Sequence, residues 1–331
     1  MSEIDEIVTQ NALRNVDELP SLSVQDYIQR ATTDNTRKAY QQDIRHFESW
    51  GGKLPTDTAT VIRYCHAHAE SHNPRTLQRR LVALKQFHTY QGFADPTSHP
   101  AVRKTLRGIQ NTHGKPKRKA QALQLEQLKT VVDFLSSRDD LISARDCALI
   151  SIGFFGALRG SELVHLQHGH IDVSEQGLTI TIERSKTDPT GEGQHVALPQ
   201  LNNNYCPITL LERWLSISCL SSGYLFRSIN RWEQISTKPL TVRGLNKIIA
   251  RIADQCELPN ADRYSSHSLR RGLATCASAA GASFKSIMQQ GRWKHQGTVL
   301  EYIEEGQRFT DNPVHSLFQE PYNDRTERDP V

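Results

Sequence analysis

Side chains from two distant segments of this chain could act together on a phosphodiester. His267 and Arg270 are three positions apart at the start of a predicted helix, so they project from one face of it. Arg270 can direct two N–H groups at two phosphate oxygens, which lysine cannot do. Arg159 follows an apolar helical stretch, where a guanidinium is partly buried and needs Glu162 or a bound anion as its partner. Two such arginines predict one phosphate bound between them.

Tyr302 is the candidate nucleophile. Val299 and Leu300 precede it and Ile303 follows it, an apolar helical stripe that is typical of a core tyrosine. A phenol with a pKa of about 10 is neutral at pH 7 and needs help to attack. Nearby arginines and a histidine base such as His267 would supply that help. On these residues alone, both a core tyrosine and a nucleophile remain possible.

The first third of the chain is predicted to be a small all-helical domain. Asn73 and Pro74 form a helix start, with a capping side chain followed by proline at the first helical position. Arg75 and Arg79 are expected on the face opposite the apolar one, either against DNA or in solvent. The predicted apolar face consists of Leu77, Leu81, Leu84 and His88.

Basic residues are concentrated in one block of an otherwise balanced chain. Eleven Lys and Arg lie between Ser71 and Lys119 against one acid, Asp95, whereas the whole chain carries a net charge of +4. Such a block predicts a polyanionic partner and favours nucleic acid, although a solvated charged face is the ordinary alternative. The candidate DNA contacts are Arg75, Arg79, Arg80, Lys85, Lys117, Arg118 and Lys119.

Composition shifts divide the chain into four parts. An acidic flexible tail is expected first, then the helical domain, then a basic linker with Gly114 and Pro116, and last a larger second domain. The expected bounds are residues 1–21, 22–112, 113–121 and 122–331.

The second domain is predicted to be mostly α with a small antiparallel β-sheet. Helical periodicity alternates there with three short β-rich stretches, and a turn-rich loop lies between the last two of these. The strands are expected at 171–173, 178–182 and 195–198. The helices are expected at 123–135, 141–155, from 160 onward, 208–220, 242–256, 268–280 and 284–290, with a last one carrying Tyr302.

Composition excludes several classes of protein. With 37% hydrophobic and 23% charged residues, the sequence is that of a globular protein, and no apolar run approaches the roughly 20 residues that cross a bilayer. The N-terminus is acidic, unlike a signal peptide. The six cysteines form no CxxC pair, so free thiols in a reducing compartment are expected. We expect a cytoplasmic, nucleoid-associated protein, encoded by a bacterium, phage or plasmid, without a membrane partner.

Six short motifs in register resemble the tyrosine recombinase (phage integrase) family. Arg159 lies in Ala-Leu-Arg-Gly-Ser-Glu-Leu, Lys186 in Arg-Ser-Lys-Thr between two predicted strands, and Arg270 in His-Ser-Leu-Arg. Gly-Arg-Trp293 precedes Tyr302 by nine residues, and tryptophan at that place is similar to the Cre branch. The motifs cover about residues 122–318. The helical N-terminal part matches only in type, as the family's core-binding domain.

The resemblance implies a role for each matching residue in a cut-and-rejoin reaction on DNA. Tyr302 would attack the scissile phosphate, leaving a 3′-phosphotyrosine and a free 5′-hydroxyl. Arg159 and Arg270 would hold the non-bridging oxygens, and Lys186 would protonate the leaving oxygen. His267 would handle the tyrosine proton, and Trp293 would pack on the phosphate and hydrogen-bond to it. Glu162 would support the arginines and the histidine.

The resemblance also implies the cofactors and partners. No metal, nucleotide or other cofactor is required, because the bond energy is kept in the phosphotyrosine. The partners are a duplex with an inverted-repeat target site and three further copies of the chain, which form a homotetrameric synapse. The segment 304–331 would dock on a neighbouring copy. His295 and Arg271 are second candidates beside Trp293 and Arg270.

Two other functions compete with this interpretation. Glu162, His165, His168 and His170 have the spacing of a possible zinc site, which would indicate a metal-dependent hydrolase. The basic block is equally compatible with a DNA-binding protein that has no catalytic activity.

Overall fold

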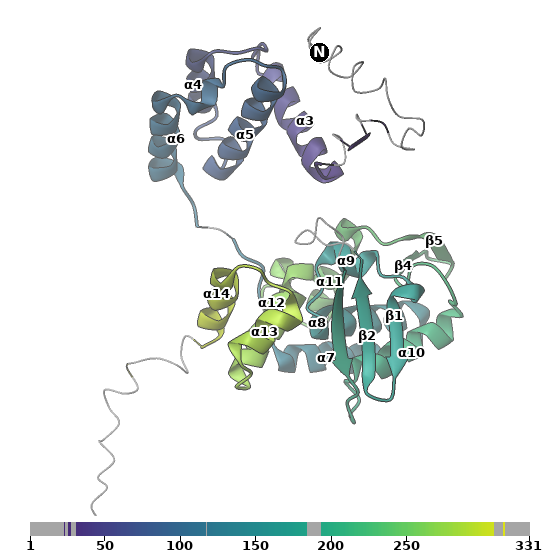
Figure 1. Ribbon diagram of the computed structural model, residues 1–331. Helices are drawn as coiled ribbons and strands as arrows, with labels where there is room; N and C mark the ends of the chain where they lie inside the picture. Colours follow the sequence, from purple (N-terminus) through teal and green to yellow (C-terminus); the bar gives the residue numbers. More distant parts are fainter. Residues whose placement is uncertain are drawn as a thin grey trace, which may run out of the picture. The chain divides into compact units, whose positions relative to one another are not determined.

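The computed structural model describes residues 23, 26–27, 31–116, 118–183, 193–307 and 314. The chain divides into two compact units, Met1–Lys117 and Arg118–Val331, and each is described by itself (Figure 1). The division falls inside the segment 113–121 that was expected to link two domains. The predictions for the tail 1–21, for Lys117, for Lys186 and for nearly all of 308–331 lie outside the described residues.

The N-terminal unit is built from helices, as predicted. Each helix starts where a side chain accepts a backbone N–H: Thr33 caps α3, Asp57 caps α4 and Asn73 caps α5. The helices are α3 (Asp34–Ser49), α4 (Thr58–Ala67), α5 (Pro74–Tyr90) and α6 (Pro100–His113), with a short 3-10 turn at Pro96–Ser98.

The predicted apolar face of α5 is the buried one. Leu77, Leu81, Leu84 and His88 all lie inside, with Phe47 of α3 and Tyr64 of α4. His88 is satisfied there, because its Nδ1 lies 2.7 Å from the Leu84 carbonyl oxygen and its Nε2 accepts the backbone N–H of Thr56 at 2.9 Å. This face therefore holds α5 in the core and leaves the opposite face exposed.

Arg80 contradicts the expectation that it contacts DNA. It is buried, with its Nη1 3.3 Å from the Tyr64 hydroxyl and its Nε 3.7 Å from Asp43. The reason is positional: Arg80 follows Leu77 by three residues and precedes Leu84 by four, so it shares their inward face. Its guanidinium group therefore interacts with Tyr64 and Asp43 inside this unit.

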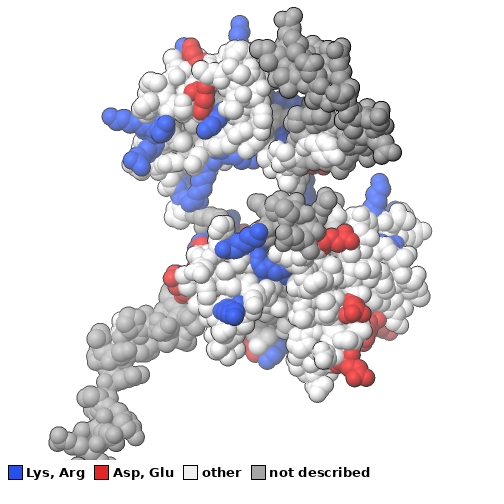
Figure 2. All heavy atoms as spheres, viewed as in Figure 1, with Lys and Arg blue, Asp and Glu red and all other residues white. Residues whose placement is uncertain are grey.

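Basic side chains cover part of the surface of the N-terminal unit. Figure 2 shows Lys and Arg gathered over the region where α6 lies in Figure 1, and Arg103, Lys104 and Arg107 of α6 are exposed. Arg75 and Arg79 are exposed as predicted, and Arg79 donates to Asp43 at 2.7 Å. Lys85 is exposed and lies 4.0 Å from Asp95.

The second unit is mostly α-helical with small antiparallel sheets, which confirms the predicted fold class. Its helices are α7 (Leu125–Ser136), α8 (Leu141–Phe155), α9 (Gly160–Val164), α10 (Pro207–Ser218), α11 (Val242–Gln255), α12 (Ser266–Ala279), α13 (Phe284–Gly291) and α14 (Gln296–Gln307). Its strands are β1 (Ile171–Ser174), β2 (Gly177–Ile182), β3 (Gln194–Pro199), β4 (Arg227–Ile229) and β5 (Ile235–Pro239).

The three predicted strands form one antiparallel sheet in the order β1-β2-β3. Ile180 faces Ile171 on one side and Val196 on the other, so apolar side chains meet across the sheet. The β4–β5 hairpin was not predicted. Its strands are three and five residues long, with a register shift between Arg227 and Ile229, so the sequence shows no apolar alternation there.

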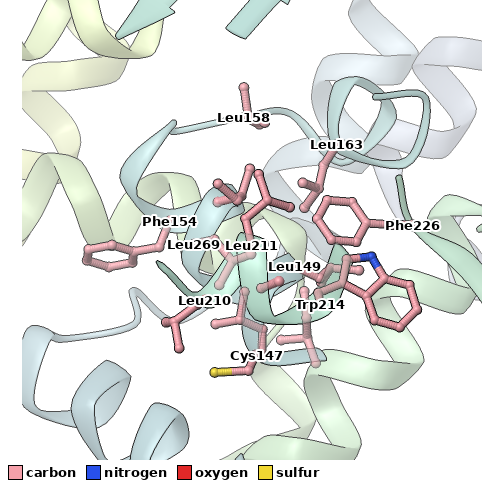
Figure 3. Close-up of a cluster of buried hydrophobic side chains, with 14 of the residues drawn as sticks. Cys147, Leu149, Phe154, Leu158, Leu163, Leu210, Leu211, Trp214, Phe226 and Leu269 are labelled. Atoms are coloured by element: carbon pink, nitrogen blue, oxygen red, sulfur yellow. The ribbon is translucent and has the colours of Figure 1, made fainter. Parts of the chain in front are cut away.

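Helix α8 is the centre of the second unit, and α7, α10 and α12 pack against it. It is buried around its whole circumference, which is typical of a core helix. Figure 3 shows Leu149 and Phe154 of α8 among side chains from α10 and α12, including Trp214 and Leu269. The indole N–H of Trp214 donates to the Leu225 carbonyl at 2.9 Å, which satisfies its only polar atom. No helix among the described residues has the length and apolar character needed to cross a bilayer.

Gly272 allows the entering chain to lie directly on α12. The backbone N–H of Leu123 donates to the Ser268 carbonyl at 3.1 Å, and a Cβ on Gly272 would lie 2.2 Å from the Leu123 carbonyl oxygen. Because that neighbour is backbone, it cannot move aside as a flexible side chain could. The absence of a side chain at Gly272 therefore lets Leu123 pack directly on α12, the helix that carries Arg270.

Two Gly→Ala substitutions should have opposite effects on stability. Gly272→Ala forces Leu123 off α12 and should lower the free energy of unfolding of the second unit by about 1–3 kcal/mol. Gly108 lies on the exposed face of α6, where a Cβ would meet nothing within 4 Å. Gly108→Ala should therefore raise the free energy of unfolding of the first unit by about 0.5–1 kcal/mol. Urea unfolding of each variant, with probes in each unit, measures both. Equal effects would contradict the close approach at Gly272.

Candidate active site

Glu162 is the buried carboxylate around which the candidate site is assembled. It lies in the first turn of α9, where its Oε2 accepts the backbone N–H of Arg159 at 2.9 Å and its Oε1 accepts Nη1 of Arg159 at 2.5 Å. Only 3% of its side chain is exposed. Arg159 thus finds the acidic partner, three residues on, that its partial burial required.

Arg292 is a further buried arginine that sequence reasoning missed. Its Nη2 donates to Oε2 of Glu162 at 2.8 Å, and its Nη1 donates to the Gln290 carbonyl at 3.1 Å and the Gly156 carbonyl at 3.3 Å. It adopts the left-handed conformation, with φ 53°, at the end of α13. The available signal was its place between Gly291 and Trp293, inside a motif already singled out.

Arg270 projects from α12 into the same cluster. It is 5% exposed and donates to the carbonyls of Ala157, before α9, and Gly291, at the end of α13. The second contact ties it to the loop that carries Trp293, whose ring centroid lies 4.3 Å from the guanidinium carbon. Gly291 must lack a side chain, because a Cβ there would overlap the Trp293 ring.

Among the described residues, this cluster brings three guanidinium groups close to one carboxylate. Burial lowers the pKa of Arg270 to about 9, and the nearby Arg159 and Arg292 act in the same direction, against Glu162 and Tyr302. Burial favours the protonated form of Glu162, yet the two arginines and the Arg159 N–H outweigh it and hold its pKa below the ordinary 4.5. A phosphate bound beside these guanidinium groups would be stabilised by their positive charge.

Tyr302 lies on α14 beside this cluster and is half-buried. Its ring centroid is 6.2 Å from that of Trp293, and the guanidinium carbon of Arg271 is 5.1 Å from its ring. The Thr275 hydroxyl donates to its backbone carbonyl at 3.1 Å, which holds α14 against α12. Tyr302 is therefore not sealed in the core.

Arg271 is directed to a different place from Arg270. It is buried and donates to the Ala120 carbonyl, in the chain entering the second unit, while its guanidinium lies over Tyr302. It therefore supports the tyrosine and does not replace Arg270 in the cluster.

The remaining predicted residues are placed as follows. His267 is exposed in the first turn of α12, and His295 is exposed just before α14. Lys186 lies in 184–192, outside the described residues. Gly193, just before β3, borders an open hollow of about 450 Å³ that Arg292 and Trp293 also line.

The acid and histidines at 162–170 do not converge on a metal position. Glu162 is held by its arginines, and the Nδ1 of His165 lies 2.8 Å from the Ser161 carbonyl. The Nε2 of His168 lies 3.0 Å from the Leu220 carbonyl, and that of His170 lies 3.5 Å from Glu183. Within the described part of the chain, they do not form a group that could hold an ion. The zinc interpretation of this segment is therefore wrong.

Two of the basic residues expected to contact DNA from the linker are paired within the second unit. Arg118 lies 2.5 Å from Asp262, and Lys119 is paired with Glu301 of α14. Both partners are at least partly exposed, so these pairs add little stability and can exchange for phosphates.

Comparison with known proteins identifies the family of this chain. Residues 121–308 match the model of the phage integrase family, and residues 25–91 match that of the phage integrase N-terminal SAM-like domain. The chain belongs to the phage integrase family. An integrase/recombinase XerD homologue of Selenomonas ruminantium is 30% identical over 321 residues, 94% of each chain. The tyrosine recombinase XerC of Pelotomaculum thermopropionicum is 26% identical, covering 79% of this chain and 85% of its own.

Solved structures of phage integrase family members share the fold. XerH recombinase bound to palindromic difH substrate superposes with a TM-score of 0.61 at 17% identity, over 86% of this chain and 79% of its own. A lambda integrase dimer bound to a core site gives 0.61 at 14% identity, over 93% and 88%. The tryptophan that resembles the Cre branch thus occurs in a chain whose relatives carry Xer names.

Glu162→Gln should destabilise the second unit at pH 7. The substitution leaves Arg292 buried without its charge partner, a loss of about 3–5 kcal/mol in unfolding free energy. Because the folded-state pKa of Glu162 is depressed, its contribution is complete above about pH 4.5 and is lost as pH falls through the folded value. Urea unfolding between pH 3.5 and 7 should show the two proteins converging in acid. The exposed Glu126→Gln is the control, with little change expected; a similar loss there would contradict this assignment.

Proposed function

We propose that this chain is a site-specific DNA recombinase that cleaves and rejoins DNA through a 3′-phosphotyrosine on Tyr302. The observation that carries the proposal is the convergence of Arg159, Arg270 and Arg292 around Glu162, with a half-buried tyrosine, Tyr302, beside them. A dianionic transition state at phosphorus is the kind of ligand that such a site would hold most tightly.

In the first step, the Tyr302 oxygen attacks the scissile phosphorus while the bond to the 5′-oxygen breaks. The phenolic proton passes to His267, which is placed on the exposed first turn of α12. Lys186 gives a proton to the departing 5′-oxygen, a role carried by its position in the family motif. The products are a 3′-phosphotyrosyl bond and a free 5′-hydroxyl, and attack by a second 5′-hydroxyl reverses the step.

The arginine cluster stabilises the charge that develops on the non-bridging oxygens. Arg159 and Arg270 direct their guanidinium groups at those oxygens, and Arg292 holds Glu162 so that Arg159 keeps its orientation. Trp293 packs on Arg270 and completes the wall of the site. Since the charge stabilisation comes from fixed cations, this chemistry needs neither metal nor nucleotide.

The DNA partner is proposed to be a duplex with an inverted-repeat site, bound by the N-terminal unit and the linker. Exposed arginines on α5 and α6 support contacts to phosphates. Relatives with the same fold are described as bound to palindromic difH and to a core site. We further propose four copies in the synapse, with the segment 304–331 of one docking on the next.

Substitution of the nucleophile tests the covalent step. A suicide duplex nicked next to the cleavage site should trap the wild-type protein as a covalent adduct that survives denaturation. Tyr302→Phe should yield no adduct while retaining affinity for the duplex within about twofold. Tyr205→Phe, which removes another phenol of the same unit, should behave as wild type. An adduct on Tyr302→Phe moves the nucleophile elsewhere, and no adduct with the wild type supports DNA binding without catalysis.

Substitution of a guanidinium tests the source of charge stabilisation. A lysine cannot donate to both carbonyls and to phosphate, so Arg270→Lys should slow adduct formation by about 10²–10³. Arg138→Lys, on the exposed surface, is the matched control and should leave the rate unchanged. At saturating duplex, and with circular dichroism showing the chain still folded, excess chelator should not change the wild-type rate. Under those conditions, a rate that falls with chelator and returns with a divalent ion would contradict cation-only stabilisation.

A further inference from the structure

Three histidines of the N-terminal unit face one another across three segments. His46 lies in the last turn of α3, His68 caps the end of α4, and His72 lies in the turn that leads into α5. One ligand nitrogen from each lies within 4.8 Å of those of the other two. Among the described residues, no other group of histidines, cysteines and acids approaches in this way.

The spacing of the rings fits tetrahedral coordination. The ring centroids are 4.9 Å apart for His46–His68, 5.3 Å for His46–His72 and 4.9 Å for His68–His72. Three imidazoles bound to Zn²⁺ at about 2.0–2.1 Å, with tetrahedral angles, place their centroids about 5 Å apart. Because the ring centroids already have this spacing, rotation of the rings would bring their nitrogens from within 4.8 Å of one another toward a common ion.

The hydrogen bonds leave one nitrogen of each ring for a ligand. Nδ1 of His46 is 2.9 Å from the Tyr64 hydroxyl, and Nδ1 of His72 is 2.9 Å from the Ser71 hydroxyl. With the hydrogens on Nδ1, both rings donate to these oxygens and present an Nε2 lone pair, the usual arrangement of metal-bound histidines. Nε2 of His68 is buried and has no hydrogen-bond partner in the protein.

The charges around the cluster favour neutral rings. Burial lowers the pKa of His46, His68 and His72, and the Arg80 guanidinium acts in the same direction. Arg80 does not face the cluster uncompensated, because Asp43 lies 3.7 Å from its Nε. Imidazole nitrogens at this spacing suit Zn²⁺ and its neighbours better than Mg²⁺ or Ca²⁺.

We propose that His46, His68 and His72 bind one divalent transition-metal ion, with Zn²⁺ the best match, and that the ion clips α3 to the α4–α5 turn. Water fills the fourth position. The site lies in the N-terminal unit and contains none of the residues proposed for cleavage, so the ion stabilises this unit and takes no part in strand cleavage.

Zinc binding by the full-length, untagged chain tests the proposal. After treatment with chelator, equilibrium dialysis should show one high-affinity Zn²⁺ per chain. Removing one ligand, in His72→Ala, should weaken binding at least about tenfold. His66→Ala, which removes an exposed histidine two residues before His68, should bind as wild type. If His72→Ala loses the helical circular dichroism of the wild type, His72→Gln is measured in its place.

Two further measurements separate this site from adventitious binding. Co²⁺ in place of Zn²⁺ should give the intense visible absorption of a four-coordinate ion, and this band should disappear in the His72 variants. Saturating Zn²⁺ should raise the thermal midpoint of the N-terminal unit by about 4 °C or more in the wild type and in His66→Ala, and by less in the His72 variants. Absence of zinc uptake, or equal affinity in His72→Ala and wild type, overturns the proposal. Neither result bears on the covalent adduct at Tyr302.

Discussion

The arrangement of the catalytic unit depends on the enclosure of one carboxylate by arginines. Glu162 receives Arg159 from its own turn and Arg292 from the end of α13, and the carbonyl of Ala157 receives Arg270 from α12. Residues more than a hundred positions apart in sequence are thereby drawn to one point. Burying a guanidinium is costly without a partner. The Glu162 carboxylate and the carbonyls of Ala157 and Gly291, which accept from Arg270, therefore determine where these elements can meet.

Arginines from separate segments converge in this cluster, and the proposed function uses them to bind a phosphate. Arg159 and Arg292 pair with Glu162, while Arg270 donates to two backbone carbonyls, so these contacts hold α9, α12 and α13 together. Ala157, with φ 44°, adopts a left-handed backbone conformation that alanine rarely uses, at the position whose carbonyl receives Arg270. Local strain and clustered guanidinium groups therefore coincide at the same site.

Local patterns in the sequence predicted much of this structure, whereas contacts between distant segments were harder to anticipate. Helix α8 was predicted with its observed bounds, because an apolar run between Asp140 and Gly156 has clear start and stop signals. The partnership of Arg159 with Glu162 followed from their spacing. Arg292 was missed because its partner lies 130 residues away, and the three-histidine cluster was missed because His46 belongs to a different helix from His68. Arg80 was misassigned because charge was given more weight than its place on the helix.

Helix α14, which carries Tyr302, packs in a small hydrophobic cluster of its own. It packs on a satellite cluster of buried Ala274, Ile287 and Val299, separate from the main core around α8. Of the residues that the structure describes, only three buried ones form this cluster, far fewer than form the main core, so the opening free energy of α14 should lie below that of global unfolding. Amide hydrogen exchange in α14 would then be faster than in α12. In the proposed reaction, this would allow Tyr302 to move with its own helix while the main core around α8 stays in place.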